Sequence, residues 1–172
     1  MKGAFISALT LTVLQLACQS DIEPRDIAIA EGEEIARQQL KGGYVIAGNQ
    51  AIDLGRAIYV FLVQSEDNAM RVVIDAKTGR LIDVRDKTED FLNAKSRGEA
   101  IDAKQIPSRR QAAEQAALQF APGYIRKWFA KQENGRLVFK IKIRNGIDKE
   151  TRVTIDGDTF AVLETAEDDT LD

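Results

Sequence analysis

The sequence contains no histidine and only one cysteine, Cys18, among its 172 residues. Catalysis by Ser-His-Asp or Cys-His groups needs a histidine base, and the usual zinc sites take histidine or cysteine ligands. These absences exclude both kinds of site. The net charge of -3 also gives no general attraction to nucleic acid or to an anionic membrane. We therefore expect no nucleic-acid partner, and membrane attachment only through a lipid anchor.

Long apolar runs are also scarce, and the one at the start of the chain has the features of an export signal. Lys2 precedes an uncharged, largely apolar segment at residues 4–17, which is too short to span a bilayer comfortably. We interpret residues 1–20 as a signal peptide. Two processing routes stay open. Residues 14–18 resemble a lipoprotein box, with Gln15 at a usually apolar position, which would make Cys18 the lipidated first residue. Otherwise cleavage follows Ser20.

The mature chain has the composition of a soluble globular protein, with 44% apolar and 30% charged residues over the whole sequence. It contains an internal repeat. Arg71, Val72, Ile74, Asp75 and Thr78 each recur 81 positions later. Upstream matches recur at an offset of 80, as in Gly43-Tyr44 with Gly123-Tyr124 and Gly55-Arg56 with Gly135-Arg136. This pattern predicts two copies of one folded unit.

The first copy, residues 21–84, reads as one helix followed by about four antiparallel strands. We expect the helix at residues 27–41, a short strand at 44–47, a loop at 48–54, and further strands at 57–64 and 70–74 before a closing hairpin. Residues 85–105 read as a linker with a short helix near Phe91.

The second copy, residues 106–165, follows the same plan and precedes an acidic tail at 166–172. Ser108 and Gln111 fit a capping box at the start of its helix. One helix face then carries Ala112, Ala113, Ala116, Ala117 and Phe120. Asn134-Gly135 is typical of a type I′ hairpin turn, and we expect the last strand at residues 160–164.

These residues resemble the PepSY domain, a small module of secreted bacterial proteins. The resemblance rests on a helix that ends in glycine, a Gly-Arg-x-x-Tyr/Phe strand, and the segment from Arg71 to Ile82. It covers residues 27–84 and 106–163, although Phe160 replaces the turn glycine in the second copy. The resemblance implies a cystatin-like form, one helix on a sheet. It also implies regulation of peptidases, since related modules occur in thermolysin-like propeptides.

Asp75 and Asp156 occupy equivalent places before tight turns. Acid–base chemistry would need them as a pair, but each copy needs its own turn, so we interpret both as acceptors of backbone amide hydrogen bonds. Arg71 and Arg152 are expected to pair with carboxylates on neighbouring strands. Asp156-Gly157-Asp158 lacks the remaining oxygens of a calcium loop. We predict no catalytic residue, metal or cofactor.

Two surfaces are candidates for binding. In residues 137–144 the alternation predicts that Lys140, Lys142 and Arg144 form a basic ladder opposite the helix. Acidic residues of 150–164 and the tail could neutralise this ladder, or an acidic partner could bind it. The equivalent strand of the first copy has Val60 and Leu62 instead of lysines, so its outer face needs an apolar cover. That cover is the other copy, the linker near Phe91, or a partner.

The expected fold is therefore α+β, with two tandem cystatin-like modules. The expected function is that of an exported, non-enzymatic protein, periplasmic, lipid-anchored in the outer membrane or secreted. It would bind a protein or peptide, with steric inhibition of a secreted metallopeptidase as one candidate activity. The alternative is an envelope-associated scaffold or ligand sensor with no peptidase partner. The oligomeric state is left open.

Overall fold

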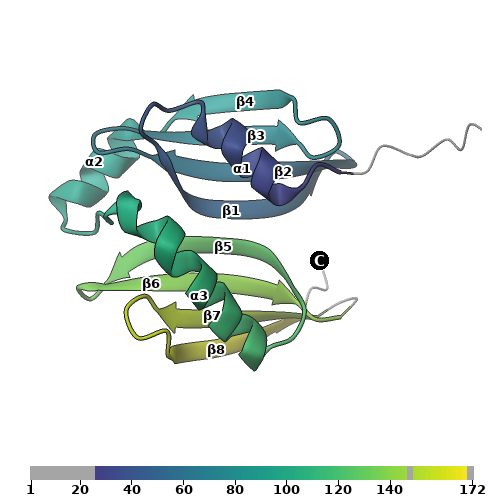
Figure 1. Cartoon of the computed structure of the whole chain (residues 1–172), viewed down its shortest axis with the longest axis vertical. Coiled ribbons are helices and arrows are strands. Elements are labelled where there is room, and N and C mark those ends of the chain that lie inside the picture. Colours follow the sequence, from purple (N-terminus) through teal and green to yellow (C-terminus); the bar gives the residue numbers. More distant parts are fainter. Residues whose placement is uncertain (1–25, 147–148, 170–172) are drawn as a thin grey trace, which may run out of the picture.

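The computed structural model describes residues 26–146 and 149–169. The predicted signal peptide at residues 1–20, with Cys18, lies outside these ranges, as do the last three residues. Over the described residues the chain has an α+β fold with one eight-stranded antiparallel sheet, in the order β4-β3-β2-β1-β5-β6-β7-β8 (Figure 1). The elements are α1 (Ile29–Arg37), β1 (Tyr44–Asp53), β2 (Arg56–Gln64), β3 (Ala69–Asp75), β4 (Leu81–Asp86), α2 (Thr88–Ser96), η1 (Ala103–Gln105), α3 (Ile106–Phe120), β5 (Tyr124–Glu133), β6 (Arg136–Arg144), β7 (Lys149–Asp156) and β8 (Val162–Asp169).

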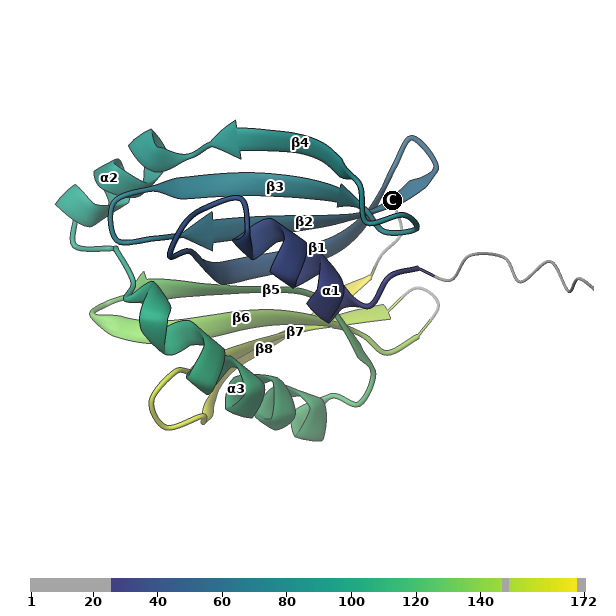
Figure 2. The ribbon, with the colours of Figure 1, turned by 45° about the horizontal axis from the view of Figure 1, so that its top comes forward.

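Helices α1 and α3 lie on the same side of the sheet, α1 over β1–β4 and α3 over β5–β8 (Figure 2). Each helix buries small residues against its own half, Ala36 in α1 and Ala113 and Ala117 in α3. Alternate residues of β2 and β6 point at these helices, including Phe61 and Phe139, which are fully buried. The period of two in β6 thus places its apolar side chains in the core, as predicted from the sequence.

The internal repeat is visible in the backbone, where even the register shifts of the strands recur at equivalent positions. A register shift between Val45 and Ala47 in β1 recurs between Ile125 and Lys127 in β5, at an offset of 80. Asp75 accepts hydrogen bonds from the amides of residues 77 and 78, and Asp156 from those of residues 158 and 159. This confirms that both aspartates fix turns.

The two halves join through β1 and β5, which pair antiparallel over three residues. The central pair is Gly48 opposite Trp128, two positions 80 apart and therefore equivalent in the repeat. Equivalent residues meet in an antiparallel pair only when an approximate two-fold axis runs between them. A side chain at Gly48 would place its Cβ 2.7 Å from the indole nitrogen of Trp128. The absence of a side chain at Gly48 therefore makes room for the indole ring of Trp128 at the junction between the two halves.

The sequence-based expectation of a loop at residues 48–54 is wrong. β1 continues to Asp53 and pairs with β2 along its whole length, with Leu54 and Gly55 as the two-residue turn. Both turn residues have positive φ, 49° and 77°. The prediction failed because leucine is not a typical residue for this conformation.

The predicted start of the second helix is also wrong. α3 begins at Ile106, directly after the turn η1, and the Ser108 hydroxyl donates to the Gln105 carbonyl instead of capping the helix. Asp102 accepts from the Lys104 amide and so caps η1. Phe120 is 53% exposed because α3 ends there, at the edge of the core.

The linker contains the predicted helix near Phe91, α2, and its first two residues belong to β4. At the other end, β8 runs to Asp169 and pairs with β7, so residues 166–169, expected in the acidic tail, form part of a strand.

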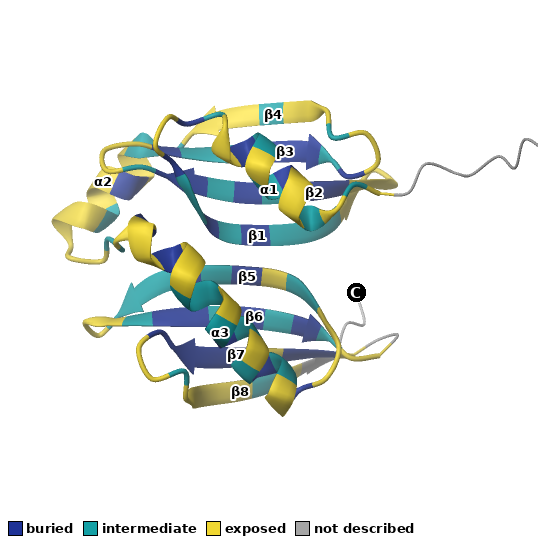
Figure 3. Ribbon diagram, viewed as in Figure 1, coloured by how far each residue is buried: buried dark blue, intermediate teal, exposed yellow. Residues whose placement is uncertain are grey.

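Burial is greatest in the inner strands, while the outer faces of α1 and α3 and the edge strand β4 are exposed (Figure 3). No helix of the described residues has the length and apolar character needed to cross a membrane.

Candidate functional site

The face of the sheet opposite α1 and α3, called here the open face, brings together the side chains predicted to bind a partner. Strand pairing aligns Leu62, Ala47, Phe129 and Lys140 in one cross-strand row. A second row contains Val60, Asn49, Lys127 and Lys142. Directly paired residues point to the same side of a sheet. Val60, Leu62, Lys140 and Lys142 thus share one continuous face, and Arg144 follows Lys142 along β6.

In the first half, the open face is hollowed into a groove of about 940 Å³. Val60, Leu62 and Val73 contribute apolar side chains to it, and α2 closes one end with the buried Phe91. The linker therefore gives Val60 and Leu62 part of the apolar cover that the sequence called for. Both remain only half-buried. This incomplete cover leaves an apolar surface in contact with solvent.

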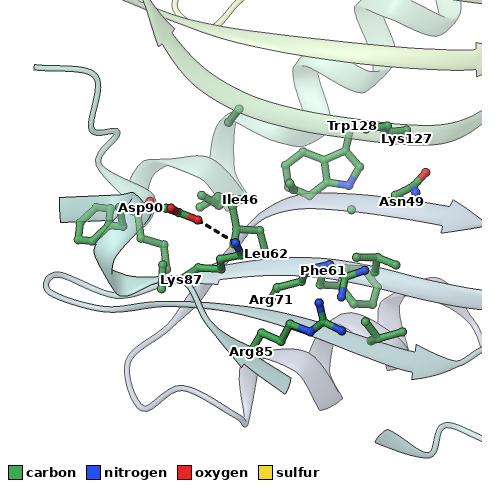
Figure 4. Close-up of a pocket in the computed structure, with 18 of the residues that line it drawn as sticks. Ile46, Asn49, Phe61, Leu62, Arg71, Arg85, Lys87, Asp90, Lys127 and Trp128 are labelled. Carbon is green, nitrogen blue, oxygen red and sulfur yellow. Dashed lines mark hydrogen bonds and ion pairs between the residues drawn. The ribbon is translucent and has the colours of Figure 1, made fainter. Parts of the chain in front are cut away.

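Charged side chains border the groove. Figure 4 shows Arg71 and Arg85 together on one side, with Lys127 on the other. Both arginines pair with the single carboxylate of Asp83, at 3.4 Å and 2.7 Å. Lys87 pairs with Asp90 at 2.8 Å, as the dashed line in Figure 4 marks. One carboxylate for two guanidinium groups leaves this border with surplus positive charge, which favours an acidic ligand.

In the second half, the same face is basic and partly neutralised from within the chain. Lys140 pairs with Glu133 at 2.9 Å, and hydrogen bonds from Lys131 and Lys140 lower the pKa of Glu133. Glu150 is 4% exposed and pairs with Arg126, with Lys142 at 3.8 Å and with Arg144 at 3.5 Å. Glu150 belongs to the acidic segment predicted to neutralise the ladder. The pairing of Glu133 with Lys140 was not predicted from the sequence, because it depends on the register between β5 and β6.

A shallower hollow of about 290 Å³ lies on this basic half. Its lining consists of Lys127, Phe129, Lys140, Lys142 and Arg152. Lys127 also lines the larger groove, so the two hollows meet at β5. The open face thus changes from apolar to basic across the junction between the halves.

A second cluster joins the halves on the helix side of the sheet. Arg110 of α3 pairs with Glu33 of α1 at 2.6 Å and with Glu114 at 2.5 Å. Its guanidinium lies 4.1 Å from the centre of a Trp128 ring. Burial raises the pKa of Glu33, although Arg110 opposes the shift. The partner choice of Arg110 could not be predicted from sequence, since it depends on how the halves meet.

The paired-aspartate hypothesis has no support in the geometry. Each carboxylate is occupied by its own turn, and the pKa of Asp156 is lowered by hydrogen bonds from the amides of Thr159 and Asp158. Asp158 pairs with Arg109 of α3, so neither acid of this turn is free to bind a cation. Among residues 26–146 and 149–169, no cluster of three or more potential metal ligands occurs.

Comparison with known proteins agrees with this architecture. Residues 33–85 match the family model described as "Peptidase propeptide and YPEB domain", the PepSY domain. A crystal structure from Clostridium difficile 630, described as that of a "putative lipoprotein", aligns with a TM-score of 0.53 and 20% identity. The alignment covers 84% of this chain and 95% of that one. Curated proteins gave no match. The matched segment begins within α1 and ends within β4, so the resemblance to the PepSY domain covers the first half of the fold.

Proposed function

We propose that this chain is an exported, non-enzymatic binding protein whose open face receives an extended segment of a protein partner. The observation that carries the proposal is the half-covered groove along Val60 and Leu62. Exposed apolar patches rimmed by polar groups are typical of interaction sites. The basic ladder of Lys140, Lys142 and Arg144 lies beside the groove. It would position acidic groups of the partner and increase the rate at which the partner associates.

The similarity to the PepSY domain supports one class of partner. Its family description names a peptidase propeptide, which supports a secreted peptidase as the partner and steric occlusion as the mechanism. The chain itself would supply no bond-making group, because its sequence has no histidine and its two turn aspartates are occupied structurally. Occlusion requires only that the open face cover the approach to the peptidase active site.

Residues 106–165 would form a second PepSY-like, cystatin-like module. The repeated bulges, turns and hydrogen bonds of the second half support this, because they recur at the sequence offsets of 80 and 81. The N-terminal segment, with Cys18 as the candidate lipidation site, supports export. The lipoprotein description of the structural neighbour supports the same location, at the cell envelope.

The test is an inhibition assay of the mature chain against a panel of secreted metallopeptidases. Val60→Lys and Leu62→Lys place in the groove the side chains that Lys140 and Lys142 carry at equivalent positions. We expect these variants to fold and to lose inhibition by about tenfold or more, because charge in an apolar contact is strongly unfavourable.

The matched control is the reverse exchange, Lys140→Val with Lys142→Leu, which should alter mainly the salt dependence of association. Inhibition that is unchanged in Val60→Lys would contradict the groove as the binding site. If the panel shows no inhibition, the peptidase assignment fails, and the alternative of an envelope-associated scaffold takes its place.

A further inference from the structure

The two equivalent hairpin tips of the repeat differ in a way that the open face does not explain. The β1–β2 tip consists of Ile52, Asp53, Leu54 and Gly55, and the β5–β6 tip has Gln132, Glu133, Asn134 and Gly135. The first turn residue has φ of 49° in Leu54 and 50° in Asn134. Asparagine tolerates this left-handed conformation, whereas leucine adopts it only with strain. The β1–β2 tip thus retains a residue that its own backbone disfavours.

The same leucine is fully exposed. Leu54 has a relative exposure of 101% and Ile52 of 78%, the two largest values among the exposed large hydrophobic residues of the described chain. Both positions are polar in the other tip. No core contact compensates for the strain at Leu54, so its aliphatic side chain has no role in the folded chain alone. Strain combined with apolar exposure indicates a contact with something outside the molecule.

The position of the tip identifies that contact. The chain enters the fold beside it, because the Ile27 amide donates to the Ala76 carbonyl at 2.7 Å and the Ala76 amide donates to Ala57, one residue from β2's start. Figure 2 shows the start of α1 and the β1–β2 tip at the same end of the sheet. Only the seven residues 19–25 separate Cys18 from Asp26, the first described residue, and the eight residue steps from 18 to 26 span at most about 29 Å. A lipid on Cys18 would hold the entry point of the chain within that distance of a bilayer, and the tip lies at the same end of the sheet.

The other tip provides an internal reference. β1 and β5 run antiparallel, so the hairpins that follow them lie at opposite ends of the sheet. The aliphatic tip is at the end where the chain enters, and the polar Gln132 and Asn134 are at the far end. This is the arrangement expected if only one end meets the membrane.

We propose that Ile52 and Leu54 insert into the interface of the bilayer that holds the lipidated N-terminus, as a second membrane contact. Stable anchoring generally takes two signals, and a second contact also fixes orientation. The inference rests on the lipid-anchored form of the proposed function. The experiment supplies the anchor chemically, so that a failure of natural lipidation and a failure of the tip are distinguishable.

The experiment uses the chain from residue 18 to residue 172, coupled through its single cysteine to a maleimide phospholipid in vesicles of phosphatidylethanolamine and phosphatidylglycerol. Leu54→Trp places an indole at the tip, and Asn134→Trp places one at the reference tip. Trp128 is 1% exposed and supplies a constant background. The readout is quenching by phospholipids brominated along the acyl chains.

We expect brominated vesicles to quench the Leu54→Trp signal about twofold, because interfacial side chains reach acyl-chain depth, and to leave Asn134→Trp unchanged. Equal quenching of both variants, or of neither, would overturn the proposal. The second outcome would leave an apolar pocket on a protein as the contact for the tip.

A second measurement avoids the new tryptophan. With Cys18 alkylated and no tether, Ile52→Gln with Leu54→Asn copies the reference tip and should reduce partitioning onto the same vesicles about tenfold, because two aliphatic contacts are removed. Thermal unfolding of the variant checks that it folds. Unchanged partitioning would contradict membrane insertion. Val60→Lys should not affect quenching, so the groove and the tip are tested separately.

Discussion

The two halves of this molecule share a backbone but present different surfaces. Their bulges, turns and turn hydrogen bonds recur at fixed offsets, because each half must satisfy the same backbone groups. Their open faces and hairpin tips differ, with Val60 and Leu54 in one half where the other has Lys140 and Asn134. Residues that hydrogen-bond to backbone amides in the turns are the same in both halves, whereas many residues whose side chains face outward differ between them. The four predictions below test this comparison.

The largest expected effect is at the junction of the halves. Trp128→Ala should lower the free energy of unfolding by about 3–5 kcal/mol, because it removes a large side chain that is 1% exposed. Urea denaturation followed by far-ultraviolet circular dichroism measures the change. Trp128→Phe is the control and should cost much less, since the indole nitrogen has no hydrogen-bond partner in the described part of the chain. Equal losses would show that packing at the ring does not join the halves.

Glu150 should give the next largest effect. Glu150→Gln removes the buried carboxylate that pairs with Arg126, Lys142 and Arg144. We expect a loss of about 2 kcal/mol, below the usual value for a buried pair because the three cations are partly exposed to solvent. The equivalent position in the first half, at the offset of 81, is Ala69, so the loss measures how much stability the buried carboxylate adds beside the basic side chains of the second half. Glu164→Gln, on the exposed strand β8, should change stability little.

Exchange of the hairpin residues should shift stability in opposite directions. Leu54→Asn should stabilise the fold by about 1 kcal/mol and Asn134→Leu should destabilise it by a similar amount, since leucine is disfavoured at positive φ. Thermal denaturation of both variants and of the double exchange measures this. A loss of stability in Leu54→Asn would mean that the leucine serves the fold after all.

The smallest effect concerns the two turn aspartates and appears as a pH dependence. Burial acts to raise the pKa of Asp75, but hydrogen bonds from Thr78 and Lys77 and the nearby Arg56 outweigh it, so the pKa lies below the ordinary 3.8. The pKa of Asp156 is also lowered. A lowered pKa in the folded state stabilises the fold above the ordinary value, and this stabilisation is lost as the pH falls through the folded-state pKa.

Stability should therefore decrease below about pH 4, and the decrease should be smaller in Asp75→Asn and in Asp156→Asn. Denaturant titrations at a series of pH values from 6 downward measure the slope. Because the turns are equivalent, the two variants should behave alike. A variant that kept its stability but lost partner binding would reveal a functional role for that aspartate.

Local chemistry explains how much could be predicted from the sequence. The turns at Asp75 and Asn134 and the inward side of β6 depend on nearby residues, and the structure agrees with those predictions. The family resemblance was carried by the segment that begins at Arg71, and the PepSY match includes it. The placement of Val60 on the outward strand face followed from its equivalence in the repeat to Lys140, and Val60 lines the groove on that face.

What could not be predicted depends on contacts between distant segments. The single sheet arises from the pairing of β1 with β5 around Gly48 and Trp128, which no local pattern indicates. The tip at Leu54 was missed because its conformation is set by strand register against the preference of the residue. The basic border of the groove could not be predicted either, because Arg71 and Arg85 come together only through the pairing of β3 with β4. The sequence predicted the surfaces but not how they join.

The meeting of Gly48 with Trp128 has a consequence for the origin of the chain. A contact in which each position faces its own counterpart is the contact that two identical polypeptides make in a symmetric dimer. The arrangement is therefore what would result if a dimer of half-length subunits had been fused into one chain, with residues 85–105 as the connection. After such a fusion the sequence of one half could change independently of the other. In a homodimer every substitution appears in both subunits.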